Sequence, residues 1–365
     1  MFLIYLLIIF FAGLLAFLLT GFVRNLAIKK QILSVPRERD VHQKPIPRLG
    51  GVAIAGTIIV TLLVVNLFNP QLLNFTAESR FGFDRHLLGV IVGMIIITLI
   101  GVWDDLTDLK PRWQFLLQFL AASVIIASGI GIDYIRSPWG LIPLNQWHWP
   151  LFTIGNYSTS ITLWSDLFTM VWLVIIMNVI NWLDGLDGLA TGISGIAAFM
   201  LFVLSLLIGD HTATTILALI VAGAAFGFLP WNWHPAKIFM GSSGSYGLGF
   251  VLAVLAIISG GKLATAILVL GLPVFDAIWV ASKRIFAGRS PLSADRSHLH
   301  HRLIDSGLSV RKSVGLLYVI ALIFGILALI DSDAQAKLVL ILWVVAVLVI
   351  LGALTILLEK RNGKK

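Results

Sequence analysis

Eleven long apolar runs divide this 365-residue chain and restrict what it can fold into. They lie near 2–23, 50–68, 87–103, 114–132, 163–180, 188–208, 213–229, 245–260, 263–281, 314–330 and 338–358. Each is close to the roughly 20 residues that a helix needs to cross the hydrocarbon core of a bilayer. With 58% apolar and 12% charged residues, the chain has too little polar surface for a water-soluble globule. The sequence therefore predicts an all-α polytopic integral membrane protein, about 11 transmembrane helices forming a single domain over 1–365.

The distribution of Lys and Arg predicts the orientation, because basic residues in short loops stay cytoplasmic. With the N-terminus outside, 21 of the 26 Lys and Arg fall in the inner segments 24–48, 104–112, 230–243, 282–312 and 359–365. The first apolar run is interpreted as a retained span, since its start is uncharged and no small-residue cleavage site follows it. We expect a multi-pass protein of the plasma (inner) membrane, with these five segments on its cytoplasmic face.

The net charge of +8 fits this topology and attraction to anionic lipids of the bilayer. The basic loops lack the interleaved aromatic residues on which bases stack, so no nucleic-acid partner is expected. The long outer loop, 133–162, contains Pro, Gly and the aromatic residues Trp139, Trp147 and Trp149. This pattern predicts an interfacial hairpin or cap at the headgroup level. Because the chain has no Cys, a disulfide framework and a thiolate metal site are both excluded.

Five polar clusters are predicted to lie on the cytoplasmic face. They are "RERDVHQKPIPRLGG" (37–51), "DDLTDLKPR" (104–112), "NVINWLDGLDGLATG" (178–192), "KIFMGSSGSYGLGF" (237–250) and "SKRIFAGRSPLSADRSHLHHRL" (282–303). Together they offer acids that can hold a divalent cation, bases that can bind phosphate, and Gly-rich helix starts, where the backbone can approach a phosphate and donate N–H groups to it. This combination indicates phosphoryl transfer or phosphate-sugar chemistry at the membrane.

Two pairs of carboxylates are candidates for that chemistry. Asp104 and Asp105 are adjacent, so on a helix they point about 100° apart and cannot serve one ligand without a break; solvated helix ends are the alternative. Asp184 and Asp187 are three residues apart, which on a helix would place them on one face. Since uncompensated carboxylates beside hydrocarbon become neutral or bind a cation, this second pair predicts a site for Mg²⁺, with Mn²⁺ as the alternative.

The last inner segment supplies His298, His300 and His301 within "HLHH", between Arg296 and Arg302. Histidines beside arginines suit a diphosphate, which they contact through charge-assisted hydrogen bonds and general-acid chemistry. A zinc site is the alternative, although it would lack a third well-spaced ligand. Asp276, an acid inside the ninth run, is either functional or the partner of an interhelical hydrogen bond.

The quoted motifs, read together over 36–305, resemble the polyprenyl-phosphate N-acetylhexosamine-1-phosphate transferases, which include the GlcNAc-1-phosphate and MurNAc-pentapeptide transferases. "HLHH" resembles the GlcNAc branch more closely. The resemblance implies that a polyprenyl (undecaprenyl) phosphate attacks the β-phosphorus of a UDP-N-acetylhexosamine and releases UMP. That reaction would initiate a cell-wall or surface glycan such as lipopolysaccharide or teichoic acid. A homodimer is a candidate assembly.

The resemblance also carries roles over to matching positions. It implies catalytic roles for Asp104, Asp105, Asp184, Asp187 and His298, with Asp184, Asp187 and, weakly, Ser242 at the metal. The residues implied or inferred to bind substrate are Lys44, Arg48, Asn178, Asn181, Gly241, Ser242, Gly244, Ser245, Asp276, Arg296, His300, His301 and Arg302.

Two positions depart from the family pattern. The family motif F-x-G-D-x-G-S has its metal-binding Asp where this chain has Ser242, and a frequent family Lys is replaced by Gln114. A hydroxyl is a neutral and weak ligand for magnesium compared with a carboxylate. A catalytically impaired paralog that serves as a membrane scaffold, or a transporter, is therefore the alternative function.

Overall fold

The computed structural model describes residues 1–34, 44–76, 79–80, 83–137, 139–154, 157–209, 212–259, 263–286, 288, 298–330 and 334–361. The helices of the first half are α1 (Phe2–Lys29), α2 (Gly50–Phe68), the 3-10 helix η1 (Pro70–Leu73), α3 (Arg85–Thr107), α4 (Pro111–Ala127) and α5 (Leu163–Leu183). Those of the second half are α6 (Leu189–Ile208), α7 (Thr212–Asn232), α8 (Gly241–Ile258), α9 (Leu263–Val269), α10 (Gly271–Phe286), α11 (Leu299–Asp305), α12 (Val310–Ala328) and α13 (Ala334–Arg361).

Within the described ranges, each predicted apolar run is mainly helical, which confirms an α-helical polytopic membrane protein. Among the described residues, nine helices are long and apolar enough to cross a membrane. The predicted fourth span is the shorter apolar helix α4, which has 17 residues. The predicted ninth span is divided into α9 and α10 at Leu270. Hydropathy could not reveal this division, because the residues on both sides of it are equally apolar.

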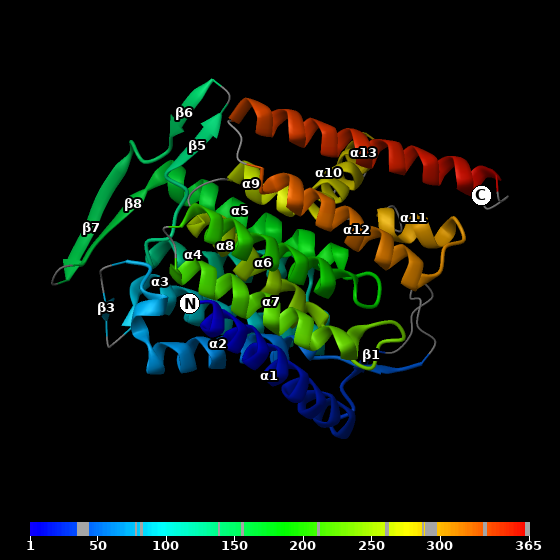
Figure 1. Ribbon diagram of the computed structural model, residues 1–365, viewed down its shortest axis with the longest axis horizontal. Helices are drawn as coiled ribbons and strands as arrows, with labels where there is room; N and C mark the ends of the chain where they lie inside the picture. The colour runs from blue at the N-terminus through cyan, green and yellow to red at the C-terminus, as the bar shows by residue number, and fades with distance from the viewer. Residues whose placement is uncertain are drawn as a thin grey trace.

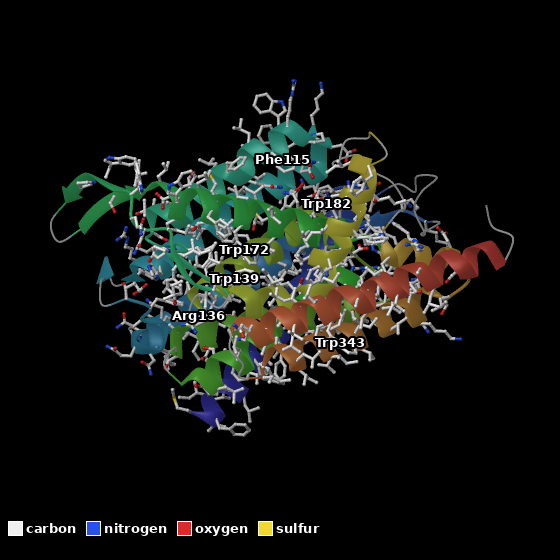
Figure 2. All side chains as sticks on the ribbon, turned by 90° about the horizontal axis from the view of Figure 1, so that it is seen from above. Phe115, Arg136, Trp139, Trp172, Trp182 and Trp343 are labelled. Carbon is white, nitrogen blue, oxygen red and sulfur yellow. The ribbon has the colours of Figure 1, made fainter. Side chains whose placement is uncertain are left out.

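Most of the long helices run side by side along the longest axis of the molecule (Figure 1). The N-terminus lies toward the end that carries β5 to β8, whereas the C-terminus lies at the end with β1 and α11. α10 departs from this arrangement, because it runs across the direction of its neighbours (Figure 2). Figure 2 also places Phe115 on α4 and Trp343 on α13 near opposite edges of the bundle.

The strands form four antiparallel pairs of two strands each. They are β1 (Leu33–Ser34) with β2 (Ile46–Pro47), β3 (Ser79–Arg80) with β4 (Phe83–Asp84), β5 (Tyr134–Ser137) with β6 (Gly140–Pro143), and β7 (His148–Ile154) with β8 (Tyr157–Thr162). The predicted outer cap therefore consists of two hairpins, and its Trp139 is 89% exposed.

The core is centred on α8, which packs against α2, α3, α5, α6 and α7. Glycines allow this close approach: a Cβ on Gly51 of α2 would lie 1.9 Å from the backbone N of Gly244, and a Cβ on Gly101 of α3 would lie 2.3 Å from the Cα of Ser243. Small residues at such crossings are the usual means of packing helices in membranes, where no hydrophobic force drives helices together. The first turn of α8 is consequently held by α2 and α3.

Candidate functional site

The start of α8 is bound by a carboxylate from α3. Asp105 accepts hydrogen bonds from the backbone N–H groups of Ser242 (2.8 Å) and Ser243 (3.1 Å), and from the hydroxyl of Ser243 (2.8 Å). Gly241 has a φ of +70°, and a Cβ there would lie 2.5 Å from the Asp105 carboxylate. The N–H groups that we expected to meet a phosphate are thus directed at Asp105, and α8 begins four residues before the predicted run.

Asp104 points to a different neighbour. Its Oδ1 accepts from the backbone N–H of Leu109 (2.9 Å) and from Nε2 of Gln114 (2.8 Å) on α4. The two adjacent acids therefore do not converge on one point, as their spacing on a helix predicted. Gln114, the second departure from the family pattern, is a neutral donor that joins the end of α3 to α4.

Arg48 is a cation that lies beside the end of α3. Its Nη1 lies 3.4 Å from the backbone oxygen of Asp105 and 3.8 Å from Oδ1 of Asp108. Its chain segment is held against the segment that precedes α8, because Phe239 N–H donates to Pro47 (2.8 Å) and Gly50 N–H donates to Phe239 (2.9 Å). Lys44, the other predicted base, is described and exposed at the start of this segment.

Residues 184–188 form a turn between α5 and α6, so the expectation that Asp184 and Asp187 share one helix face is wrong. Gly188, with a φ of +78°, is the last residue before α6 begins, in a left-handed conformation that favours glycine. Within the turn, Asp187 is paired with His234: Nδ1 of His234 lies 2.7 Å from Oδ2, which also accepts from the backbone N–H of Ala236 (3.1 Å).

The last residue of α7 supports this turn at a second point. Oδ1 of Asn232 accepts from the backbone N–H of Gly188 (3.1 Å) and from the hydroxyl of Thr191 (2.8 Å). Neither Asn232 nor His234 was predicted as a site residue. The motif "WNWHPAK" before the Gly/Ser stretch was the available signal, because it places polar side chains next to an apolar run.

Asp184 differs from the other acids, since its carboxylate has no hydrogen-bond partner among the described residues. It is half-buried just beyond the end of α5. Burial raises the pKa of Asp184 to about 7, and the negative charges of Asp105 and Asp187 act in the same direction, while Arg48 opposes them. Asp184 therefore lies within electrostatic reach of the other acids and of Arg48.

The remaining predicted residues of α5 and α8 contact one another. Nδ2 of Asn181 donates to the hydroxyl of Ser245 (2.8 Å). Asn178, which is buried, donates to Oε1 of Gln118 on α4 (2.6 Å) and to its own helix. Gly244 lies at the crossing with α2. These residues join α4, α5 and α8 beneath the turn at 184–188.

The histidine cluster lies where α10 and α11 meet. Nδ1 of His298 is 2.8 Å from Oδ2 of Asp276, whose Oδ1 accepts from the backbone N–H of Leu299 (2.8 Å). Asp276 therefore both orients the imidazole of His298 and satisfies the first turn of α11. The Trp182 ring, at the end of α5 and beside α10 (Figure 2), is 6.5 Å from the His298 ring.

His300 faces the turn that contains Asp184. A Cβ on Gly185 would lie 2.2 Å from its Nε2, and neither ring nitrogen has a hydrogen-bond partner although the side chain is 1% exposed. Burial, followed by the nearby His301 and His298, holds the pKa of His300 well below its ordinary value, which favours the neutral ring. The ring of His301 packs against the ring of His300 at a tilt of 46°, with 4.3 Å between the two ring centroids.

Arg302, one of the two predicted arginines, is directed away from this cluster. Nη2 of Arg302 donates to the backbone oxygen of Gly352 on α13 (2.7 Å), which directs the buried guanidinium to the C-terminal helix. Arg296 lies outside the described residues.

The side chains available as metal ligands limit how a divalent cation can be held. Among the described residues, no group of three or more His, Asp or Glu side chains is arranged to hold a metal ion. Mg²⁺ commonly keeps several waters and takes only one or two carboxylates together with substrate phosphates. The unpaired carboxylate of Asp184 fits that role.

The fold and the site define a polytopic membrane protein whose polar groups, rich in carboxylate and histidine, gather at helix ends and suit a phosphorylated substrate. Residues 87–260 match the model of glycosyl transferase family 4. A Bacillus subtilis (strain 168) relative, named probable undecaprenyl-phosphate N-acetylglucosaminyl 1-phosphate transferase, is 33% identical over 87% of this chain and 82% of its own length. The chain therefore belongs to the polyprenyl-phosphate N-acetylhexosamine-1-phosphate transferases of that family.

Two further relatives extend the match. The decaprenyl-phosphate N-acetylglucosaminephosphotransferase of Mycolicibacterium smegmatis is 33% identical over 84% of this chain and 77% of its own length. The undecaprenyl-phosphate alpha-N-acetylglucosaminyl 1-phosphate transferase of Thermotoga maritima is 29% identical over 96% of this chain and 98% of its own length. The similarity therefore includes both the apolar bundle and the polar segments.

Proposed function

We propose that this protein transfers GlcNAc-1-phosphate from UDP-GlcNAc to a polyprenyl phosphate and releases UMP, at the cytoplasmic face of the plasma membrane. The observation that carries this proposal is that Arg48 and the first turn of α8 both contact Asp105, while Asn181 near the end of α5 is hydrogen-bonded to Ser245 of α8. These contacts bring four of the motif segments together. The names of the relatives support the acceptor lipid and the transferred group. The donor of this group would be a UDP-sugar, which leaves UMP once its sugar 1-phosphate has been transferred.

In the proposed reaction, a phosphate oxygen of the lipid attacks the β-phosphorus of UDP-GlcNAc. A new P–O–P linkage forms, the bond between the α- and β-phosphates breaks, and UMP leaves with the electron pair of that bond. Since the attacking phosphate is already an anion at neutral pH, positioning contributes more than removal of a proton. This agrees with Asp104 and Asp105, whose carboxylates hold protein donors in place.

The chain's cations and imidazoles would stabilise the charge of the transfer. Arg48, which contacts Asp105, would neutralise phosphate charge. His298, oriented by Asp276, keeps Nε2 as the ring atom that can meet the diphosphate or the sugar. A divalent cation bound through Asp184 would supply further neutralisation of the leaving UMP.

Ser242 supports a second candidate function. If the missing carboxylate abolishes transfer, the chain would act as a non-catalytic membrane protein that retains the binding site. A transporter is less well supported, because the polar site residues lie at helix ends, whereas transporter sites typically lie near the bilayer midplane.

A UMP-release assay tests the proposed function. Purified protein is incubated with undecaprenyl phosphate, Mg²⁺ and a panel of UDP-sugars, and UMP and the lipid product are measured. We expect UMP and product in equal amounts with UDP-GlcNAc, and neither without lipid. If no sugar gives UMP in the wild type while Ser242→Asp does, the second candidate function is the better description.

A further inference from the structure

The acids at this site are already engaged by the protein, with one exception. Asp105 accepts three hydrogen bonds, Asp104 accepts two, and Asp187 is bound by His234 and Ala236. Each of these carboxylates would have to surrender or share these donors to bind a cation. In the described part of the chain, Asp184 is the acid of the site whose oxygens carry no hydrogen bond.

The first turn of α8 supplies no second carboxylate. Ser242 is held beside the acids by its own backbone, since its N–H group donates to Asp105. Its side chain is a neutral hydroxyl at the position where the family motif has an acid. A single carboxylate and a hydroxyl are a weak site for a hydrated divalent cation, because affinity rises with the number of charged oxygen ligands.

A buried imidazole next to the same turn also lacks a partner. His300 is 1% exposed, its Nε2 abuts Gly185, and both of its ring nitrogens are unsatisfied. A neutral imidazole has one N–H that needs an acceptor and one nitrogen that needs a donor. A hydrated cation offers only donors, through its waters. A nucleotide diphosphate sugar offers both, through phosphate oxygens and hydroxyl groups.

We propose that the divalent cation binds this protein only together with the nucleotide diphosphate, with Asp184 as its one carboxylate ligand from the protein. The inference rests on the proposed UDP-sugar donor and deepens it. The diphosphate supplies the negative oxygens that Ser242 does not, and the same ligand satisfies His300. Without the nucleotide, the described residues offer the cation only the weak site formed by one carboxylate and a hydroxyl.

Manganese retention tests this proposal without any turnover. The full-length protein, purified in detergent and without acceptor lipid, is dialysed to equilibrium against Mn²⁺ with and without UDP-GlcNAc, and protein-bound Mn²⁺ is measured by electron paramagnetic resonance. We expect stoichiometric Mn²⁺ with UDP-GlcNAc and at least about tenfold weaker retention without it. Retention that is equal in the two conditions, or absent from both, overturns the proposal.

Two pairs of variants assign the effect to residues. Ser242→Asp is expected to tighten nucleotide-free Mn²⁺ retention by about tenfold or more, whereas Ser242→Asn, of similar shape but uncharged, leaves it weak. Asp184→Asn is expected to lose Mn²⁺ retention with UDP-GlcNAc present, whereas Asp108→Asn keeps it. Gel filtration and circular dichroism confirm folding of each variant. Full retention in a folded Asp184→Asn protein contradicts the assignment.

The outcome is separable from that of the proposed function. Nucleotide-dependent Mn²⁺ retention without UMP release would leave the inference intact and refute the transferase. UMP release by a protein that binds Mn²⁺ equally well without nucleotide would support the transferase and refute the inference.

Discussion

Asp184 and Asp187 show how differently two acids of one motif can be used. Asp187 is fixed by His234 and a backbone N–H, whereas Asp184 has no such partner among the described residues. The sequence indicated that both acids were unusual, because they border apolar spans. It could not indicate which one is satisfied, because the partner of Asp187 lies 47 positions further along the chain.

Asp184→Asn should reduce turnover far more than Asp108→Asn. Asp184 is half-buried among other acids, whereas the Asp108 side chain is 65% exposed and lies 3.8 Å from Arg48. We expect a loss of about a hundredfold or more for Asp184→Asn and of about threefold or less for Asp108→Asn. UMP release from membranes that contain equal amounts of each variant measures both. Equal losses would contradict the ranking.

The raised pKa of Asp184 predicts a pH-dependent cost to stability. The pKa of Asp184 is about 7 in the folded protein, whereas an unperturbed Asp side chain has a pKa of 3.8. Because the folded state binds this proton more tightly, the stability that protonation provides is fully present below about pH 4 and is lost as the pH rises through 7. The Asp184→Asn variant has no carboxylate at this position to ionise, so the substitution removes this cost to stability. In metal-free buffer, the melting temperature of Asp184→Asn should therefore exceed that of the wild type by a few degrees at pH 8, and by less at pH 5. The same difference at both pH values would contradict this account.

The elements were predicted more completely than their contacts. Apolar length identified the helices, since a bilayer demands long uninterrupted runs. The division between α9 and α10 and the transverse direction of α10 were not predicted, because hydropathy reports how apolar a segment is and not where it bends. The glycines of α8 were read as room for a phosphate, whereas Gly244 makes room for α2.

The crossing of α2 and α8 predicts opposite effects for two substitutions on one helix. In Gly51→Ala, the new methyl group would lie 1.9 Å from the backbone N of Gly244, so the helices must separate. In Gly56→Ala, the nearest atom is Cδ1 of Leu19 at 3.8 Å, which is ordinary contact. We expect Gly51→Ala to lower stability by about 1–3 kcal/mol or more, and Gly56→Ala to be neutral or stabilising. Thermal unfolding of both variants in detergent measures the difference. A stable Gly51→Ala protein would contradict the packing.

At the scale of the whole molecule, the two ends of the bundle differ in chemistry. One end carries hairpins with exposed aromatic residues, and the other carries the acids, Arg48 and the histidine cluster. Between them, the outward faces of α1 and α13 expose large apolar side chains such as Phe10 and Trp343. A bilayer can cover that apolar band and leave both ends in water. The positions of Lys and Arg then predict which end faces the cytoplasm.

Labelling of single cysteines tests that orientation with little interference, because the chain has no Cys of its own. Asn145 is exposed between the two outer hairpins, and Lys110 is exposed where α4 begins at the site end. We expect a membrane-impermeant maleimide to modify Asn145→Cys in cells whose plasma membrane is intact, and to modify Lys110→Cys only after that membrane is permeabilised. The excess of Lys and Arg at the site end requires this order, since moving those charges across the membrane is costly. Labelling of Lys110→Cys in intact cells would place the site outside, where no cytoplasmic UDP-sugar could reach it, and would contradict the proposed function together with the orientation.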